Sequence, residues 1–100
     1  MHRIETNEIL GALKGCKDPE MDINVVDLGL LYGIRVDDSN NIVVTMTMTS
    51  PMCPVTSVIL ADAQLRIANI PDVGKVDIDL VWDPAWNPDM IAEEIRIGIM

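Results

Sequence analysis

Three stretches of the chain, residues 30–36, 42–49 and 75–82, alternate between apolar and polar positions. Their even-numbered residues are all apolar, whereas the odd-numbered ones are largely Thr, Asp, Gly and Arg. Successive side chains of a strand point to opposite faces, so this pattern predicts three strands that each bury one face. The residues predicted to face the core are Leu30, Tyr32, Ile34, Val36, Ile42, Val44, Met46, Met48, Val76, Ile78, Leu80 and Trp82.

A helical period replaces the alternation over residues 55–70. Apolar side chains recur there every three or four residues, which predicts a helix with one apolar face. That face carries Val55, Ile59, Ala63, Ile67 and Ile70.

Shorter helices are predicted near both ends of the sequence. Thr6 is a suitable cap for the first helix, and Gly15 is a natural terminator for it. The apolar residues of this helix are Ile9, Leu10 and Leu13. Asn87 is a suitable cap for the last helix, with Pro88 at its first position. The apolar residues of that helix, spaced four apart, are Ile91, Ile95 and Ile99.

The connecting segments are rich in turn-forming residues. Residues 37–41 predict a hairpin loop, and residues 83–86 predict a turn. Residues 16–28 mix acidic residues with Pro and Asn and predict an irregular acidic loop. Trp82 continues the buried face of its strand, whereas Trp86 is predicted to be an exposed contact in the turn.

The predicted order of elements is helix, strand, strand, helix, strand, helix. A sheet with one covered face needs helices on that side only. The sequence therefore predicts a single two-layer α+β domain, αββαβα, over residues 1–100, with a three-stranded sheet and all helices on one face.

Composition narrows the class of protein. Seven Lys and Arg stand against sixteen Asp and Glu, which gives a net charge of −9. Binding to nucleic acid begins with neutralisation of phosphates by clustered Lys and Arg, so we expect no nucleic-acid partner. The same charge disfavours an anionic membrane surface. The first seven residues form no apolar signal segment, and two Cys do not make a disulfide scaffold, so we expect a cytoplasmic protein.

Cys53 is the main candidate for chemistry. It lies between Pro51 and Pro54, where the helical period begins. Free backbone N–H groups and the helix dipole favour a thiolate at such a position, and a thiolate is both a nucleophile and a metal ligand. The alternative is a small apolar side chain packed under the turn.

Other polar residues are weaker candidates. Cys16 follows a helix end with no charge to activate it, so we expect a buried or half-buried thiol. Asp18, Glu20 and Asp27 could bind a hard cation or take part in acid–base chemistry, or they could be turn residues in contact with solvent. Thr49 is the hydroxyl residue of the second strand that lies nearest the Cys53 turn.

Several classes of enzyme are disfavoured. The only His is His2, which leaves no partner for a Ser-His-Asp arrangement. The Gly residues form neither GxxxxGK[ST] nor GxGxxG, so no nucleotide-binding enzyme is expected. We assign no catalytic residue.

Four segments, in this order, resemble the SufT/PaaD-like family of iron–sulfur cluster assembly factors. They are residues 18–20 (DPE), 26–30 (VDLGL), 47–54 (TMTSPMCP) and 81–86 (VWDPAW). The same domain precedes some Mrp/ApbC-type ATPases. The Cys-rich tail of the phenylacetate branch and a downstream ATPase are both missing from these 100 residues, which favours the stand-alone SufT-like branch.

The resemblance implies a fold like that of other iron–sulfur assembly domains and a pocket shared by the acids of the first two segments, the threonine and the cysteine. It implies contacts to a cluster by Cys53, Thr49 and Asp27, and contacts to a metal by Cys53, Asp18 and Glu20. Met52 stands where the family commonly has Gly and narrows the approach to the thiol.

We therefore predict a non-enzymatic accessory factor in iron–sulfur cluster assembly or in the maturation of iron–sulfur proteins. Cys53 would contact a cluster, a metal or a cysteine of a partner. Two Cys cannot fill the four thiolate positions of a cluster, so binding would be transient or bridged between the subunits of a homodimer. The expected partners are iron–sulfur carrier, scaffold or client proteins.

Two alternatives remain open. The first is a small thiol-dependent enzyme, against which stand the missing general-base His and the missing CxxC pair. The second is a pure protein-interaction adaptor in which Cys53 is inert.

Overall fold

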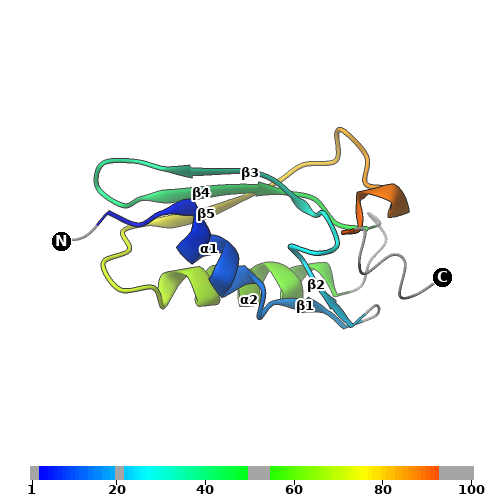
Figure 1. Ribbon diagram of the computed structural model, residues 1–100, viewed down its shortest axis with the longest axis horizontal. Helices are drawn as coiled ribbons and strands as arrows, with labels where there is room; N and C mark the ends of the chain where they lie inside the picture. Colours follow the sequence, from blue (N-terminus) through cyan, green and yellow to red (C-terminus); the bar gives the residue numbers. More distant parts are fainter. Residues whose placement is uncertain (1–2, 20–21, 50–54, 93–100) are drawn as a thin grey trace.

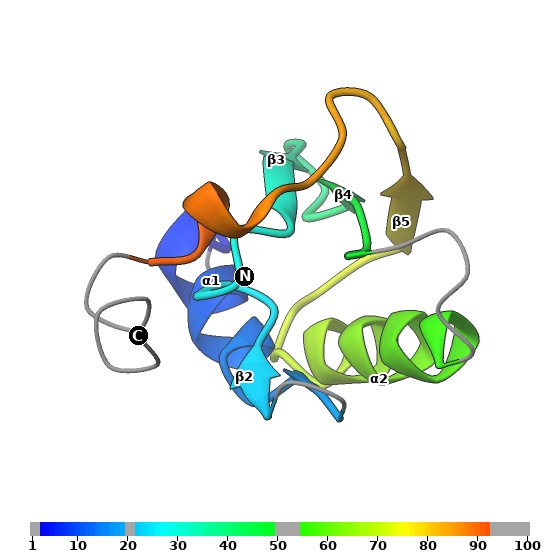
Figure 2. The same cartoon turned by 90° about the vertical axis from the view of Figure 1, so that its right-hand side faces the viewer.

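The computed structural model describes residues 3–19, 22–49 and 55–92 of the chain. One layer is a three-stranded sheet, and the helices α1 and α2 lie together on one of its faces (Figures 1 and 2). The elements in order are α1 (Thr6–Leu13), β1 (Lys17–Asp18), β2 (Ile23–Asn24), β3 (Leu31–Val36), β4 (Ile42–Met46), α2 (Thr56–Ala68), β5 (Val76–Leu80) and the 3-10 helix η1 (Pro88–Met90). The predicted two-layer α+β architecture is confirmed.

The sheet has the strand order β3-β4-β5. β3 and β4 form an antiparallel hairpin, whereas β4 and β5 are parallel and are connected through α2. Val44 of the central strand pairs with Ile34 on one side and with Ile78 on the other. Period-two alternation is the same in both kinds of pairing, so it could not distinguish them in advance.

The core lies between the sheet and the two helices. The central strand supplies its middle, since Ile42, Val44 and Met46 are fully buried. The even-numbered residues of β5 are half-buried, and Asp77 and Asp79 between them are exposed. The helices contribute the residues predicted from their period, namely Ile9, Leu13, Ile59, Ala63 and Ile67.

The alternation fails at two positions next to the end of β4. A bulge between Leu31 and Gly33 leaves Tyr32 out of the pairing register, so the predicted inward face of β3 is interrupted there. Thr47 was predicted on the outer face but is fully buried. It lies past the end of β4, where its backbone N–H donates to the Leu30 carbonyl at 2.9 Å.

The two tryptophans exchange their predicted roles. Trp82 was predicted to be buried, yet it is 42% exposed because β5 ends at Leu80 and the alternation ends with it. Trp86 was predicted to be an exposed contact. Its ring is half-buried against the core, and its Nε1 donates to the Leu28 carbonyl at 2.6 Å.

The helix ends also differ from prediction. α1 begins at Thr6, and Glu5 is the N-cap residue, with its N–H bonded to the Glu8 carboxylate at 2.9 Å. Asn87 does cap the last helical segment by accepting from the Asp89 N–H. That segment is a single 3-10 turn, because Ile91 already has an extended backbone. The other residues of the predicted final helix, Ile95 and Ile99, lie outside the described residues.

The predicted irregular loop over residues 16–28 contains a small hairpin. β1 and β2 pair antiparallel, with Asp18 opposite Ile23. Val25 and Leu28 behind the hairpin are fully buried, and they attach this segment to the core. The apolar residues among the acids therefore make the segment more ordered than its composition suggested.

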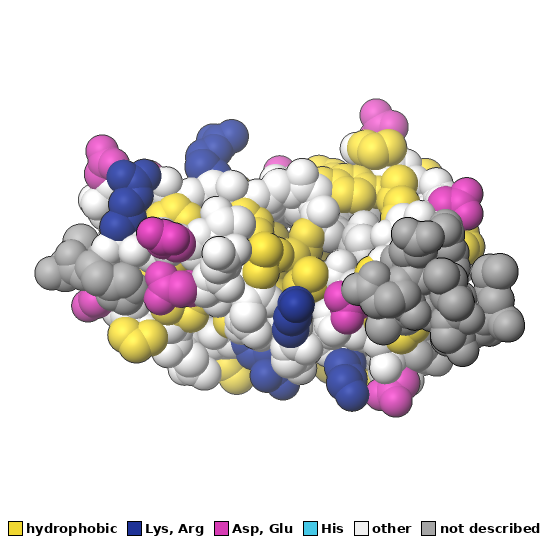
Figure 3. Space-filling model, viewed as in Figure 1, with side chains coloured by type: hydrophobic (Ala, Val, Ile, Leu, Met, Phe, Trp, Pro, Cys, Tyr) yellow, Lys and Arg dark blue, Asp and Glu magenta, His cyan; other side chains and the backbone are white. Residues whose placement is uncertain are grey.

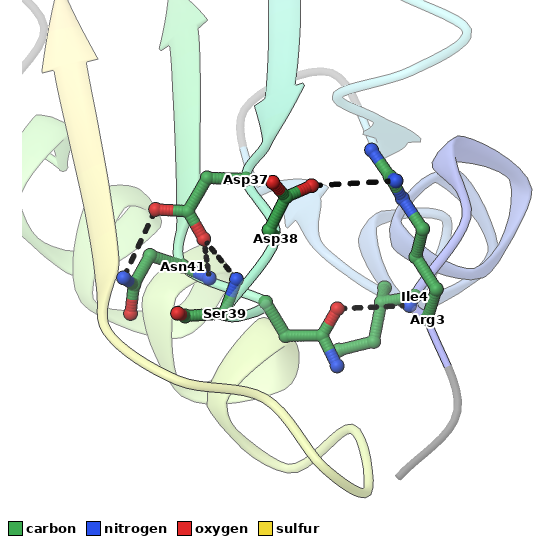
Figure 4. A network of polar contacts seen from close by, with 7 residues as sticks. Arg3, Ile4, Asp37, Asp38, Ser39 and Asn41 are labelled. Atoms are coloured by element: carbon green, nitrogen blue, oxygen red, sulfur yellow. Dashed lines mark hydrogen bonds and ion pairs between the residues drawn. The ribbon is translucent and has the colours of Figure 1, made fainter.

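A polar network closes the β3–β4 hairpin at the end of the sheet that lies away from the β1–β2 hairpin (Figure 4). Asp37 accepts hydrogen bonds from the Ser39 and Asn41 N–H groups and from the Asn41 side chain. These bonds, with those to Asn41 first, hold the pKa of the Asp37 carboxyl below its ordinary value. The Ile4 N–H donates to the buried Asn40 side chain, which ties the start of the described chain to the same loop.

Within the described residues, no helix combines the length and the apolar character needed to cross a membrane.

Candidate functional site

The described segments that carry Asp18, Asp27 and Thr49 gather at one end of the molecule. The small β1–β2 hairpin, the turn over residues 25–30, the end of β4 and the start of α2 all lie there, together with η1 (Figures 1 and 2). On the face shown in Figure 3, exposed apolar side chains gather in the middle and towards the upper right, and acidic side chains lie at both ends. The topology therefore brings segments that are distant in sequence to a common place.

Asp27 is a half-buried acid that is held in place by hydrogen bonds to Asn24. Its N–H donates to Asn24 Oδ1 at 2.9 Å, and its Oδ2 accepts from Asn24 Nδ2 at 2.8 Å. The Asn24 side-chain amide thus binds both the backbone N–H and the carboxylate of Asp27. Among the described residues no donor contacts Asp27 Oδ1, so that oxygen is available to a metal, a proton or a partner group.

Asp18 is more deeply placed, with 1% of the residue exposed, and it lies in β1. Its carbonyl accepts from the Asp22 N–H at 2.8 Å, which closes the tip of the small hairpin. Its burial distinguishes it from an ordinary solvated loop acid. Glu20, the second acid of the DPE segment, lies outside the described residues.

Thr49 is half-buried and comes three residues after the end of β4. Cys53 and the Met52 beside it lie outside the described residues. The structure therefore brings the segments of Asp18, Asp27 and Thr49 to the same end of the molecule. The shared pocket with Cys53 and Glu20 stays a prediction.

Cys16 is fully buried, as expected, and is a free cysteine. Its Sγ donates to the Ile59 carbonyl at 3.6 Å. Burial, and then the nearby Asp62 carboxylate, raise the pKa of the Cys16 thiol to about 12. The thiol is protonated at neutral pH and its side chain is fully buried, so it is not exposed as a nucleophile in the folded chain.

No group of three or more His, Cys, Asp or Glu side chains in the described part of the chain could hold a metal ion. The predicted metal ligands include Cys53 and Glu20, which are outside that part. The described acids would supply at most part of a coordination sphere, through Asp27 Oδ1 and the buried Asp18.

Two residues that shape the site were not assigned to it beforehand: the sequence pattern gave Asn24 no role, and it predicted Trp86 only as an exposed contact in a turn. Asn24 binds both the backbone and the carboxylate of Asp27, and an Asn three residues before an Asp is a recognisable local signal for such a bond. Trp86 donates to the carbonyl of Leu28, the residue that follows Asp27, although the two are 58 positions apart in sequence. No local signal in the sequence announces that contact.

Comparisons with known proteins identify the family of the chain. The model of a family described as iron–sulfur cluster assembly protein matches residues 6–78. An Fe–S protein maturation auxiliary factor of Porphyromonas gingivalis is 40% identical over 97 residues, which cover 96% of this chain and 92% of that protein. The Fe–S protein maturation auxiliary factor SufT of Staphylococcus aureus is 37% identical, over 82% of this chain and 93% of its own length.

A solved structure shows the same fold. The conserved hypothetical protein TM0487 from Thermotoga maritima superposes with a TM-score of 0.89 at 41% sequence identity, covering 99% of this chain and 97% of that one. Fold, motifs and family match point to one class, a small α+β domain of iron–sulfur cluster assembly. The chain belongs to the iron–sulfur cluster assembly protein family, and the resemblance drawn from its four motifs is confirmed.

Proposed function

We propose that this protein is an auxiliary factor in the maturation of iron–sulfur proteins and that it acts through Cys53. Membership of the family, whose model matches residues 6–78, is the observation that carries the proposal. Two relatives that match most of the chain are named Fe–S protein maturation auxiliary factors, which supports the same role. Cys16 is buried and protonated, so Cys53 is the cysteine left for this role.

The iron–sulfur cluster is the cargo in this proposal. Cys53 contacts the cluster, its iron or a cysteine of a partner. Asp27 and Thr49, whose segments lie at one end of the molecule, are the described residues proposed to assist it. One reactive thiol per chain leaves most positions of a cluster to other ligands. A carrier, a scaffold, a client or a second copy of this chain supplies them.

We further propose that the role is not enzymatic. The chain has one histidine, His2, and two cysteines that are 37 positions apart in sequence. It therefore offers neither a suitably placed histidine as general base for Cys53 nor a resolving thiol in CxxC spacing. An adaptor that docks a carrier and its client needs neither of these.

Deletion of the gene tests the proposal. The activity of iron–sulfur enzymes should fall in the deletion strain, while their protein levels and the activity of metal-free enzymes stay constant. A plasmid copy of the gene should restore the activity. If iron–sulfur enzymes remain fully active under iron limitation and oxidative stress, the proposed function is wrong.

Anaerobic reconstitution with iron and sulfide distinguishes a dimer that holds a cluster from an adaptor that holds none. A cluster held by two subunits should give visible absorption and a native mass of two chains, and both should be lost in Cys53→Ser and retained in Cys16→Ser. Absence of any cluster, together with retained support of iron–sulfur enzymes in cells, would indicate the adaptor.

A further inference from the structure

The segment over residues 84–92, here called the strap, contacts Asp27, Leu28 and Gly29, which are successive residues of the turn over residues 25–30. The Ala92 N–H donates to the Asp27 carbonyl at 2.7 Å. The Trp86 Nε1–H donates to the Leu28 carbonyl at 2.6 Å. A Cβ on Gly29 would overlap the Met90 carbonyl, so the strap backbone lies directly against that residue. Figure 2 shows the strap, which includes η1, crossing beside the cyan turn.

The strap is itself anchored. The Tyr32 hydroxyl donates to the Pro84 carbonyl at 2.7 Å, and the Trp86 ring packs against the core. The Asn87 side chain caps η1 by accepting from the Asp89 N–H at 2.9 Å. A segment that is fixed at several points along its length can hold the turn beneath it in one position.

These contacts constrain the backbone of Asp27, whereas Asn24 constrains its carboxylate. The carbonyls of residues 27 and 28 are both used by the strap. Asn24 uses the Asp27 N–H and Oδ2. Backbone and side chain are then both restrained, so the direction of the remaining oxygen, Oδ1, is set before any partner arrives. Such preorganisation is what a functional acid requires.

We propose that the strap positions Asp27 for its role and that Trp86 is a positioning residue of the site. This inference rests on the proposed function, in which Asp27 takes part. The strap lies beyond residues 6–78, the part of the chain that the family model matches. In this proposal, Asp27 lies within the matched region and is oriented by strap residues that lie outside it.

Trp86→Phe tests the inference because it removes the Nε1–H and keeps an aromatic ring. Trp82→Phe is the matched control, since Trp82 is exposed and outside the strap. Ile67→Val is a second control that lowers global stability by removing a buried methylene of α2. Tyr32→Phe removes the hydroxyl that donates to the Pro84 carbonyl, so it should weaken the anchoring of the strap less than Trp86→Phe does.

Two measurements on the full chain separate positioning from stability. Amide hydrogen exchange at Ala92 reports local opening of the strap, and it should rise about tenfold in Trp86→Phe. Restoration of iron–sulfur enzyme activity in the deletion strain should fall about fivefold in the same variant. Tyr32→Phe should also raise the exchange rate at Ala92 and lower the restored enzyme activity. Trp82→Phe and Ile67→Val should change neither quantity.

Faster exchange at Ala92 with unchanged enzyme activity would overturn the inference, and so would unchanged exchange. Equal loss of activity in Trp86→Phe and Ile67→Val would assign the effect to global stability and would also overturn it. Cys53→Ser distinguishes failure of the proposed function. If that variant restores full activity, the thiol mechanism fails, while the exchange data still report whether the strap holds the turn.

Discussion

Cys16 illustrates how the surroundings of a residue decide its chemistry. Its position after a helix end predicted an inert thiol, and the structure places it in the core with an Sγ bond to the Ile59 carbonyl. Sequence reasoning succeeded here because burial is the default for a free cysteine that no nearby charge activates. The contacts of Asp27 were beyond such reasoning, since Trp86 reaches its turn from a distant part of the chain.

The raised pKa of Cys16 makes its contribution to stability dependent on pH. The thiol titrates near 9.0 when unfolded and at about 12 when folded. The unfolded state therefore loses its proton first, and stability falls as the pH rises above 9. The free energy of unfolding of the natural chain should drop relative to that of Cys16→Ala by about 1 kcal/mol between pH 7 and pH 10.

Denaturant unfolding of the two proteins at both pH values measures this difference, because all other titrating groups are common to them. A difference that stays constant from pH 7 to pH 10 would contradict the placement of the thiol in the core.

At the scale of elements, the regular parts of the fold could be predicted and their ends could not. The alternation over residues 42–48 and the helical period of α2 both reflect burial on one face, and burial is what the structure shows. The bulge at Tyr32, the 3-10 turn η1 and the small β1–β2 hairpin depend on contacts between distant segments. Local pattern carries no information about such contacts.

Two glycines should respond in opposite ways to alanine. Gly11 lies in α1, and a Cβ added there would meet nothing within 4 Å, so Gly11→Ala should stabilise the protein by about 0.5–1 kcal/mol. Gly29 has a φ of +77° and faces the Met90 carbonyl, so Gly29→Ala should destabilise it by more than that amount. Thermal unfolding of both variants checks the pair. A neutral Gly29→Ala would show that the strap does not press on the turn.

The register of the central strand gives a second paired prediction. Val44 is fully buried between Ile34 and Ile78, so Val44→Asp should unfold the domain by burying an unpaired charge at a cost of several kcal/mol. Thr45 is half-buried on the other face and pairs with Asp79, so Thr45→Lys should remain folded. Circular dichroism of the two variants decides the matter. Folded Val44→Asp with unfolded Thr45→Lys would mean that the faces are exchanged.

At the scale of the whole molecule, the two ends of the sheet carry different features. The far end of the sheet is closed by the Asp37 hairpin network, and the opposite end gathers the segments of Asp18, Asp27 and Thr49 (Figures 1 and 4). The alternation and the helical period predicted the two layers. The convergence of these residues came from the family resemblance alone, because no periodicity relates residues 18, 27 and 49.

The net charge of −9 also acts at this scale. A net negative charge gives the proposed Cys53 thiolate little support, since negative charge disfavours the thiolate. A bound iron or cluster reverses that balance by favouring the thiolate and by using the acids as ligands or hydrogen-bond acceptors. This balance supports the proposal that the cargo contains iron.

The central claim is that Cys53 is the functional thiol of an iron–sulfur maturation factor. The most direct measurement is iron–sulfur enzyme activity in a deletion strain that carries Cys53→Ser or Cys16→Ser, with the amount of each variant protein confirmed in the same extracts. Cys53→Ser should fold normally and fail to restore activity, whereas Cys16→Ser should lose stability and still restore it. Full restoration by Cys53→Ser would contradict the claim and would remove the thiol from the mechanism.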